Sequence, residues 1–143
     1  MKILQIKTEK ALLGRYGERA AARYLRRHGY RIRKRNFVSN NHEIDIIAEN
    51  RSTVAFIEIK TRTVGNQSPN EPRPASAVDP KKQRSIISAA KSYIAFNRTK
   101  KKKSLDIIEV LVNKKRRGYS VAEIKHLQNS FNINTAYQKQ NRQ

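Results

Sequence analysis

The sequence predicts an α/β fold in which a mixed β-sheet is flanked by helices. Two segments, 9–28 and 80–97, carry small or apolar residues at the three- and four-residue spacing of one helical face. Five shorter runs rich in Ile, Val, Phe and Thr are typical of β-strands. The 143 residues suffice for one domain with a core and are too few for two ordinary ones.

The first helix is predicted from about Glu9 to His28, and Gly29 supplies its C-terminal stop. Gly14 and Gly17 lie inside this helix, where each costs roughly 0.5 to 1 kcal/mol relative to Ala. Close approach of the helix to the sheet or to a substrate would offset that cost. A stripe of arginines runs along another side of the helix. Such stripes are usually solvated, and direct phosphate contact is the alternative.

Three strands follow, predicted at Tyr30–Phe37, Glu43–Glu49 and Thr53–Thr61. The short polar segment 49–52 most simply joins the second and third strands as an antiparallel hairpin. Segment 64–79, which contains three of the four prolines, is predicted to be a loop.

The second helix is predicted to begin at Asp79-Pro80, with Asp as the cap and Pro at the first helical position, and to end near Asn97. A strand at Leu105–Val112 and a hairpin then lead into a last strand, Tyr119–Leu127. We expect residues 1–127 to form a single domain. The polar segment 128–143 is expected to be a tail without fixed structure.

Net charge is the strongest global feature of the chain. It has 32 Lys and Arg residues against 11 Asp and Glu, a formal net charge of +21. This excess implies a polyanionic partner, for which nucleic acid, an anionic membrane and an acidic protein all qualify. The absence of cysteine excludes disulfides and thiolate zinc sites. No apolar stretch is long enough to cross a bilayer and no signal-peptide pattern is present, so we expect a cytoplasmic protein.

Ionisable residues interrupt two adjacent apolar strands. Asp45 lies in the second strand, and Glu58 and Lys60 lie in the third. Because side chains alternate between the two faces of a strand, Glu58 and Lys60 point the same way, roughly 7 Å apart. If the hairpin register sets Asp45 opposite Phe56 or Glu58, all three lie on one face, with opposed Cβ atoms about 5 Å apart. A slip of one residue would turn Asp45 away.

Two carboxylates and an ammonium at this separation suit phosphodiester hydrolysis. A hard cation such as Mg²⁺ takes oxygen ligands, polarises the phosphoryl group and lowers the pKa of a bound water. The lysine would orient that water or offset charge on the transition state. A plain salt bridge of Lys60 with Asp45 or Glu58 is the simpler explanation, but it accounts for one carboxylate and not for two.

Glu18 lies on the helical stripe of Gly14, Ala22 and Leu25, the stripe that should face inward. A carboxylate in that position is costly unless it is paired or binds a metal. Two alternatives stay open: a role in the metal site, or a buried ion pair with Lys60 or an arginine.

The same residues belong to an ordered set of short motifs. The set is Gly14-x-x-Gly17-Glu18, Gly29-Tyr30, Asn36-Phe37, Glu43-Ile44-Asp45-Ile46-Ile47, Phe56-Ile57-Glu58-Ile59-Lys60-Thr61-Arg62 and 78–93. In this order it resembles the YraN-like family of small bacterial proteins. That family is similar to the PD-(D/E)xK nuclease superfamily and, within it, to Holliday-junction resolvases. The resemblance covers roughly 13–94, most of the expected domain.

The resemblance implies a restriction-endonuclease-like core and an endonuclease activity that depends on Mg²⁺ or Mn²⁺. It implies that Asp45 and Glu58 bind the metal, that Lys60 is the catalytic lysine, and that Glu18 is the extra acid of resolvase-like members. Gln83 resembles a polar residue that faces the site in related nucleases, as does its neighbour Lys82, although a solvated helix start is the commoner reason for such residues. Symmetric cuts in a junction would suit a homodimer.

Two positions depart from the family pattern. His42 stands where the family usually has Gly, and Ser104-Leu105-Asp106 stands where Arg-Phe-Asp is common. His42 would serve as a ligand or proton carrier under one interpretation. Replacement of a turn glycine is the simpler one.

Basic residues that we expect to contact nucleic acid lie on the first helix, beside the acidic residues and at both ends of the fourth strand. A strand of that length spans about 26 Å, so the clusters at its ends would hold phosphates at two separate points. Few aromatic residues lie near these two clusters, so base stacking is not strongly indicated. The expected contacts are Arg15, Arg19, Arg62, Lys82, Lys101, Lys102, Lys115 and Arg116.

The leading hypothesis is a Mg²⁺- or Mn²⁺-dependent endonuclease acting on DNA, with branched DNA as a candidate substrate. The second is a noncatalytic nucleic-acid-binding protein that retains the nuclease fold. The third is a basic, ribosome- or assembly-associated protein whose carboxylates pair with neighbouring cations. Asp45, Glu58 and Lys60 together favour the first, because a pure binder gains nothing from acids that face phosphate.

Overall fold

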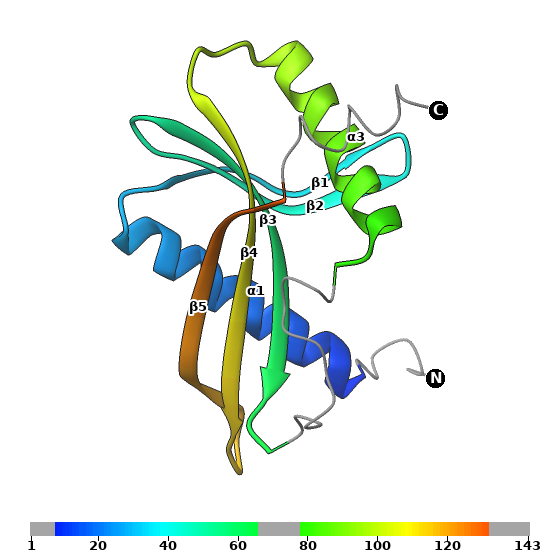
Figure 1. Ribbon diagram of the computed structural model, residues 1–143. Helices are drawn as coiled ribbons and strands as arrows, with labels where there is room; N and C mark the ends of the chain where they lie inside the picture. The colour runs from blue at the N-terminus through cyan, green and yellow to red at the C-terminus, as the bar shows by residue number, and fades with distance from the viewer. Residues whose placement is uncertain (1–7, 66–77, 132–143) are drawn as a thin grey trace, which may run out of the picture.

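A computed structural model describes residues 8–65 and 78–131, and most of the predicted loop 64–79 lies outside them (Figure 1). Five strands form one mixed sheet in the order β1-β2-β3-β4-β5, with β3 and β4 parallel and the other pairs antiparallel. The predicted α/β class, a mixed sheet flanked by helices, is confirmed. The elements are α1 (Glu9–Arg27), β1 (Arg31–Ser39), β2 (His42–Glu49), β3 (Thr53–Thr63), α3 (Pro80–Phe96), β4 (Lys102–Lys114) and β5 (Tyr119–Phe131).

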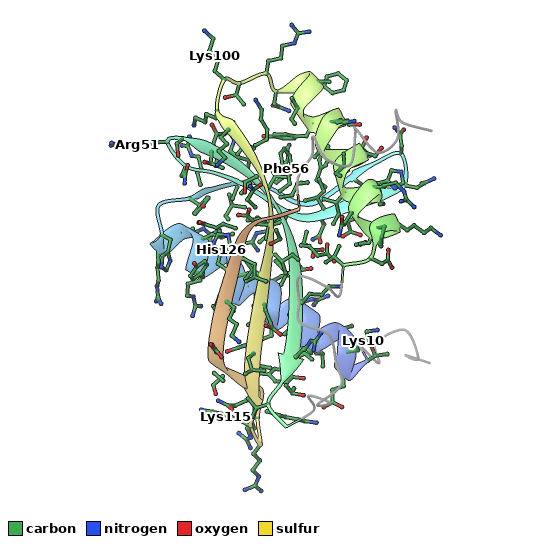
Figure 2. All side chains as sticks on the ribbon, viewed as in Figure 1. Lys10, Arg51, Phe56, Lys100, Lys115 and His126 are labelled. Atoms are coloured by element: carbon green, nitrogen blue, oxygen red, sulfur yellow. The ribbon has the colours of Figure 1, made fainter. Side chains whose placement is uncertain are left out.

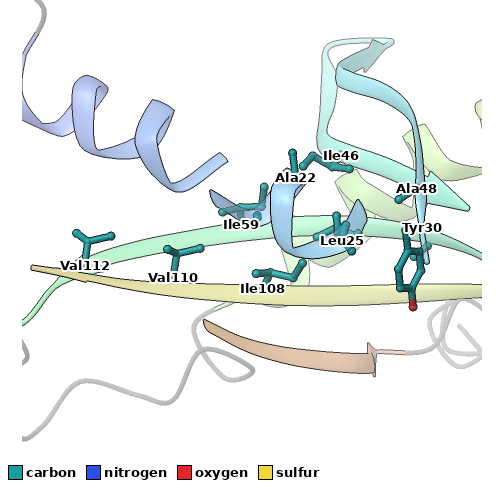
Figure 3. Close-up of a cluster of buried hydrophobic side chains, with 12 residues drawn as sticks. Ala22, Leu25, Tyr30, Ile46, Ala48, Ile59, Ile108, Val110 and Val112 are labelled. Carbon is teal, nitrogen blue, oxygen red and sulfur yellow. The ribbon is translucent and has the colours of Figure 1, made fainter. Parts of the chain in front are cut away.

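Each helix covers its own face of the sheet. Alternate residues of β3 enter two separate hydrophobic clusters: Ile57 and Ile59 pack with α1, whereas Val54 and Phe56 pack with α3. Figure 3 shows the α1 cluster, in which Leu25 of the helix meets the side chains of the central strands. Because β3 is buried on both faces, an ionisable side chain on it is enclosed unless it lies near the end of the strand.

Local sequence accounts for the ends of the helices. At the start of α3 the Asp79 side chain accepts a hydrogen bond of 2.8 Å from the N–H of Lys82, as expected of an N-cap. α1 ends where Gly29 takes a φ of 86° and the N–H of Tyr30 bonds back to the carbonyl of Leu25 at 2.9 Å. Neither helix in the described residues is long and apolar enough to cross a membrane.

The last two strands are longer than the sequence predicts. β4 begins at Lys102 instead of Leu105, and β5 continues to Phe131 instead of ending at Leu127. Leu105 is paired with Phe131, and such ladder hydrogen bonds do not depend on the polarity of the side chains. The start of the predicted tail therefore lies in the sheet, and residues 132–143 lie outside the described residues.

A tight hairpin between β1 and β2 fixes the register of the strand that carries Asp45. Ser39 pairs with His42, and the two residues between them, Asn40 and Asn41, have φ values of 51° and 67°. Positive φ at both central positions is the mark of a type I′ turn, in which asparagine is tolerated. The turn chemistry of this segment thus sets the position of Asp45 along the sheet.

Candidate active site

Asp45 lies where the pairing of β2 with β3 ends. The last pair of this ladder is Ile46 with Ile57, and the same register continued by one residue sets Asp45 opposite Glu58. Beyond this pair, the Asp45 side chain links β2 to β3 in place of a backbone pair. Its Oδ2 accepts a hydrogen bond of 2.8 Å from the N–H of Ile59. The register is one of the two under which the sequence predicts that Asp45 and Glu58 meet.

The backbone of β2 turns sharply at Asp45. Ile44 packs in the α3 cluster and Ile46 in the α1 cluster, although residues two apart on a regular strand share a face. Across the ladder, Asn36 lies opposite Asp45 and has a φ of 50°, in the left-handed region. Such irregularities re-aim a side chain. Asp45 lies at this irregularity, between residues of the two hydrophobic clusters, and its side chain is half-buried.

Glu58 is a buried carboxylate with one unsatisfied oxygen. Its side chain is 7% exposed, and Oε1 lies 3.6 Å from the Nζ of Lys60 and 3.8 Å from the Nζ of Lys82. Its Oε2 is buried and has no hydrogen-bond donor among the described residues. Desolvation, followed by the charge of Asp45, raises the pKa of Glu58 to about 7. A hydrogen bond to Asp45 contributes in the same direction, because it forms only while a proton is present.

Two lysines from different elements therefore form ion pairs with the same oxygen of Glu58. Lys60 shares its face of β3 with Glu58, as the alternation predicts, and Lys82 comes from the first turn of α3. In the described part of the chain neither lysine forms an ion pair with Asp45. The salt bridges thus account for one oxygen of Glu58, and the hydrogen bond from Ile59 accounts for one oxygen of Asp45.

α1 brings a third carboxylate towards this pair. Gly17 is buried against β3, and a Cβ added there would lie 1.8 Å from Oγ1 of Thr61, so the contact requires glycine. The next residue, Glu18, is half-buried, and its pKa is raised by desolvation and by the charges of Asp45 and Glu43. The close contact at Gly17 is what places Glu18 within electrostatic reach of the strands.

The donor set fits a hard divalent cation. Mg²⁺ commonly takes one or two protein carboxylates and keeps several waters, and Asp45 with Glu58 supplies two. A buried carboxylate oxygen without a donor, such as Oε2 of Glu58, is an atom that a cation would satisfy. Glu18 is not gathered with them, since no group of three or more His, Cys, Asp or Glu side chains within residues 8–65 and 78–131 is arranged to hold a metal ion. The candidate site is therefore a pair of carboxylates.

Two other residues that the sequence associates with the site bond elsewhere. The Nε2 of Gln83 donates to the carbonyl of Val78 at 3.0 Å, so this side chain braces the start of α3. The Nδ1 of His42 lies 2.5 Å from Oγ of Ser85, a contact that joins β2 to α3.

Exposed cations lie at both ends of the molecule. Figure 2 shows Lys100 and Lys115 at opposite ends, as expected for clusters that flank one long strand. Lys102 is exposed at the start of β4. The other predicted contacts that are exposed are Arg15 and Arg19 on α1, and Lys115 and Arg116 at the turn between β4 and β5.

Three of the predicted phosphate contacts have carboxylate partners inside the fold. Lys82 pairs with Glu58, as described above. Lys101 bonds through Nζ to Glu49, and Nε of Arg62 lies 3.9 Å from Glu109. A phosphate would compete with these carboxylates, so the three side chains are less available than the exposed ones.

Sequence reasoning assigned no role to two further buried acids on β4. Asp106 accepts a hydrogen bond of 2.9 Å from the N–H of Asn129 and lies 2.7 Å from Nε2 of His126, so its partners are internal. Glu109 is 7% exposed. Both interrupt an apolar strand, and this is the same signal that identifies Glu58 on β3.

Fold and site together define an α/β protein whose mixed sheet carries two coupled carboxylates beside two lysines. The chain matches the family model described as "Uncharacterised protein family UPF0102" over residues 17–110. The chain belongs to the UPF0102 family, which confirms the YraN-like resemblance. The matched region contains Glu18, Asp45, Glu58 and Lys60.

Bacterial relatives match over nearly their full length. A UPF0102 protein of Chlorobium phaeobacteroides is 42% identical over 122 residues, covering 84% of this chain and 93% of the relative. One from Caldanaerobacter subterraneus subsp. tengcongensis is 38% identical over 126 residues, covering 87% and 98%. One from Clostridium acetobutylicum is 38% identical over 127 residues, covering 84% and 93%.

Proposed function

We propose that this protein is a Mg²⁺- or Mn²⁺-dependent nuclease of the PD-(D/E)xK type, with a restriction-endonuclease-like core, that hydrolyses phosphodiester bonds in DNA. The observation that carries the proposal is Glu58, a buried carboxylate beside Asp45 that has a pKa of about 7 and one oxygen without a donor in the described part of the chain. Two ionised carboxylates in contact repel each other unless a proton or a cation lies between them. The Lys60 salt bridge involves Glu58 alone and the Ile59 hydrogen bond involves Asp45 alone, so neither accounts for two carboxylates set side by side.

The residues of the site divide the chemistry between them. Asp45 and Glu58 would hold the cation, which when bound would supply Lewis-acid chemistry to the phosphoryl group and to the attacking water. Lys60, 3.6 Å from Glu58, sets an ammonium where negative charge grows on the transferred phosphoryl group. Lys82 offers a second ammonium from α3, and Glu18 adds negative potential that attracts the cation. Glu18 thus attracts the cation through its negative charge and is not one of the two carboxylates that would bind it.

Substrate attraction follows from the net charge of +21 and from the exposed cations at both ends of the sheet. Contacts of this kind hold phosphates irrespective of sequence and weaken as salt rises. Branched DNA presents phosphates in more than one direction, which suits cation clusters that lie far apart. A symmetric cut at a junction would use two copies of the chain, and sedimentation with and without junction DNA tests for them.

The test is cleavage of labelled substrates: a four-way junction, a flap, a single strand, a duplex and a structured RNA. Each is incubated with Mg²⁺, with Mn²⁺ and with a chelator. The wild type is compared with Asp45→Asn, Glu58→Gln and Lys60→Met. Glu123→Gln is the matched control, because it removes an exposed carboxylate of β5.

Metal-dependent cutting by the wild type and the control, but by none of the three site variants, is the expected result. The substrate that is cut fastest names the substrate class. Tight binding without cutting of any substrate would reject the nuclease and leave a noncatalytic nucleic-acid-binding protein. Cutting of RNA alone would support the proposed phosphodiester hydrolysis but replace DNA by RNA as the substrate.

A further inference from the structure

A groove that lies apart from the acidic site runs between α1 and β5. Its volume is about 560 Å³, within the roughly 300 to 1,000 Å³ of typical ligand pockets. The described residues that line it include no Asp or Glu. Figure 1 shows α1 crossing behind β4 and β5. The residues that matter here are Tyr16, Arg19, Arg23, Tyr24 and Arg27 of α1 and Tyr119 of β5.

Arginines and tyrosines together line the helical side of the groove. Arg19, Arg23 and Arg27 are exposed and recur every four residues, so they lie one above another over roughly 12 Å of helix. That length exceeds one phosphate group and suits successive phosphates of a chain. Unlike Lys82, Lys101 and Arg62, these arginines form no ion pair with a carboxylate in the described part of the chain.

The aromatic rings are held in place by contacts between the elements. Tyr16 and Tyr119 join α1 to β5, with ring centroids 5.4 Å apart and planes tilted by 45°. The hydroxyl of Tyr24 lies 3.2 Å from Nδ1 of the buried His126, and its ring lies 4.1 Å from that of His28. Each ring is half-buried, so part of it faces the groove. Fixed aromatic surfaces lose little conformational entropy when a base stacks on them.

We propose that this groove binds a single-stranded segment of nucleic acid, with its phosphates on the arginines of α1 and an unpaired base against the tyrosines. Single strands are held by this combination of a basic groove and aromatic stacking. A duplex keeps its bases stacked inside and offers the tyrosines nothing. Glu18, on the same helix, is coupled to Asp45 instead, so the groove and the acidic site lie on different sides of α1.

The inference rests on nucleic acid as the partner and not on cleavage. Binding is therefore measured in the presence of a chelator, so that the result is independent of the nuclease activity. The probe is a short fluorescein-labelled homopyrimidine strand, followed by anisotropy over a series of salt concentrations. The same strand annealed to its complement and a pyrimidine mononucleotide serve as competitors.

The variants separate phosphate contact from stacking. Arg23→Ala removes a groove cation, and Arg26→Ala is its matched control, because Arg26 is exposed on the same helix but does not line the groove. Tyr119→Leu removes an aromatic surface, and Tyr119→Phe keeps it. Thermal melting of every variant establishes that it folds.

We expect Arg23→Ala to weaken single-strand binding and to reduce the slope of log K against log salt by about 0.7, the value for one phosphate contact on a single strand. Arg26→Ala retains the wild-type slope. Tyr119→Leu weakens binding on the order of tenfold, and Tyr119→Phe binds like the wild type. The duplex competes less well than the single strand.

Equal loss in Arg23→Ala and Arg26→Ala would mean that only net charge matters and would overturn the site. A mononucleotide that competes as well as the strand would replace the strand by a free nucleotide. Metal-dependent cleavage that is indifferent to all groove variants, together with unchanged strand binding, would reject the groove and leave the proposed nuclease intact. Binding that depends on the groove residues, without cleavage of any substrate, would support the groove and reject the proposed nuclease.

Discussion

The carboxylate of Asp45 accepts a hydrogen bond of 2.8 Å from the backbone N–H of Ile59, at the point where β2 and β3 stop pairing. One side chain thus has two tasks. It completes the connection between two strands, and it holds a negative charge beside Glu58. Substitutions at this position separate the two tasks.

Asp45→Asn should keep the strand junction, because its amide oxygen can still accept the Ile59 hydrogen bond. Asp45→Ala leaves the N–H of buried Ile59 without that partner, which costs about 1 to 3 kcal/mol. Both remove the same charge, so the difference in their free energies of unfolding, measured with urea, reports the hydrogen bond. Equal stability of the two variants would show that the contact contributes nothing.

The raised pKa of Glu58 predicts how stability depends on pH. The folded protein retains a proton on this group up to about pH 7, whereas the ordinary pKa of glutamate is 4.5. As pH rises between these values the folded state holds more protons than the unfolded state, so stability falls, by up to about 3 kcal/mol from this group. Glu58→Gln should therefore be more stable than the wild type above pH 7, with the advantage disappearing near pH 4.5.

Urea unfolding of both proteins across this pH range measures the difference. Glu123→Gln removes an exposed carboxylate and should follow the wild type at every pH. A gap between Glu58→Gln and the wild type that stays constant with pH would mean that Glu58 titrates normally.

Divalent cations should stabilise the protein, and the stabilisation should be larger above pH 7 than below it. A cation that binds only the folded state adds about 2.7 kcal/mol at one hundred times its Kd. Below pH 7 it must displace the proton of Glu58, so its affinity falls as the pH falls. Melting with Mg²⁺ or Mn²⁺ should give a Tm increase that is absent in Asp45→Asn and Glu58→Gln. An equal increase in those variants would place the cation at another site.

Gly17→Ala should destabilise the protein by about 1 to 3 kcal/mol, because the new Cβ would lie 1.8 Å from Oγ1 of Thr61. Gly14→Ala is the control. No described residue lies within 4 Å of a Cβ at Gly14, and alanine favours a helix by about 1 kcal/mol over glycine, so this variant should gain stability. Thermal melting measures both.

Thr61→Ala tests the reason for the Gly17 effect. It removes Oγ1 and Cγ2 but keeps the Thr61 Cβ, which lies 2.8 Å from the position of the added atom. The double variant Gly17→Ala, Thr61→Ala should therefore recover part of the lost Tm. A Gly17→Ala protein as stable as the wild type would mean that α1 shifts freely on the sheet, and with it Glu18.

Several features follow from local rules and could be predicted from the sequence. Alternation along β3 places Glu58 and Lys60 on one face, because the period of a strand is two. The stop at Gly29 and the cap at Asp79 follow from backbone and side-chain geometry within a few residues. The glycine spacing in α1 predicted a close approach, and the structure assigns it to Gly17 and not to Gly14.

Other features depend on residues far apart in the sequence. The polar end of β5 stays in the sheet because β4 supplies hydrogen-bond partners, which composition does not reveal. Lys82 reaches Glu58 only because α3 packs on that face of the sheet. Tyr16 meets Tyr119 across α1 and β5 for the same kind of reason.

The sequence by itself determined the class of fold and the places where elements begin and end to within a few residues, and it predicted Asp45, Glu58 and Lys60 as the candidate site. Each depends on interactions between near neighbours. Only the tertiary structure decided that Asp45 leaves the ladder to bond Ile59, and that Oε2 of Glu58 has no hydrogen-bond donor within residues 8–65 and 78–131. Desolvation and charge coupling depend on which distant groups pack together, so the pKa of a buried carboxylate is a property of the packed molecule.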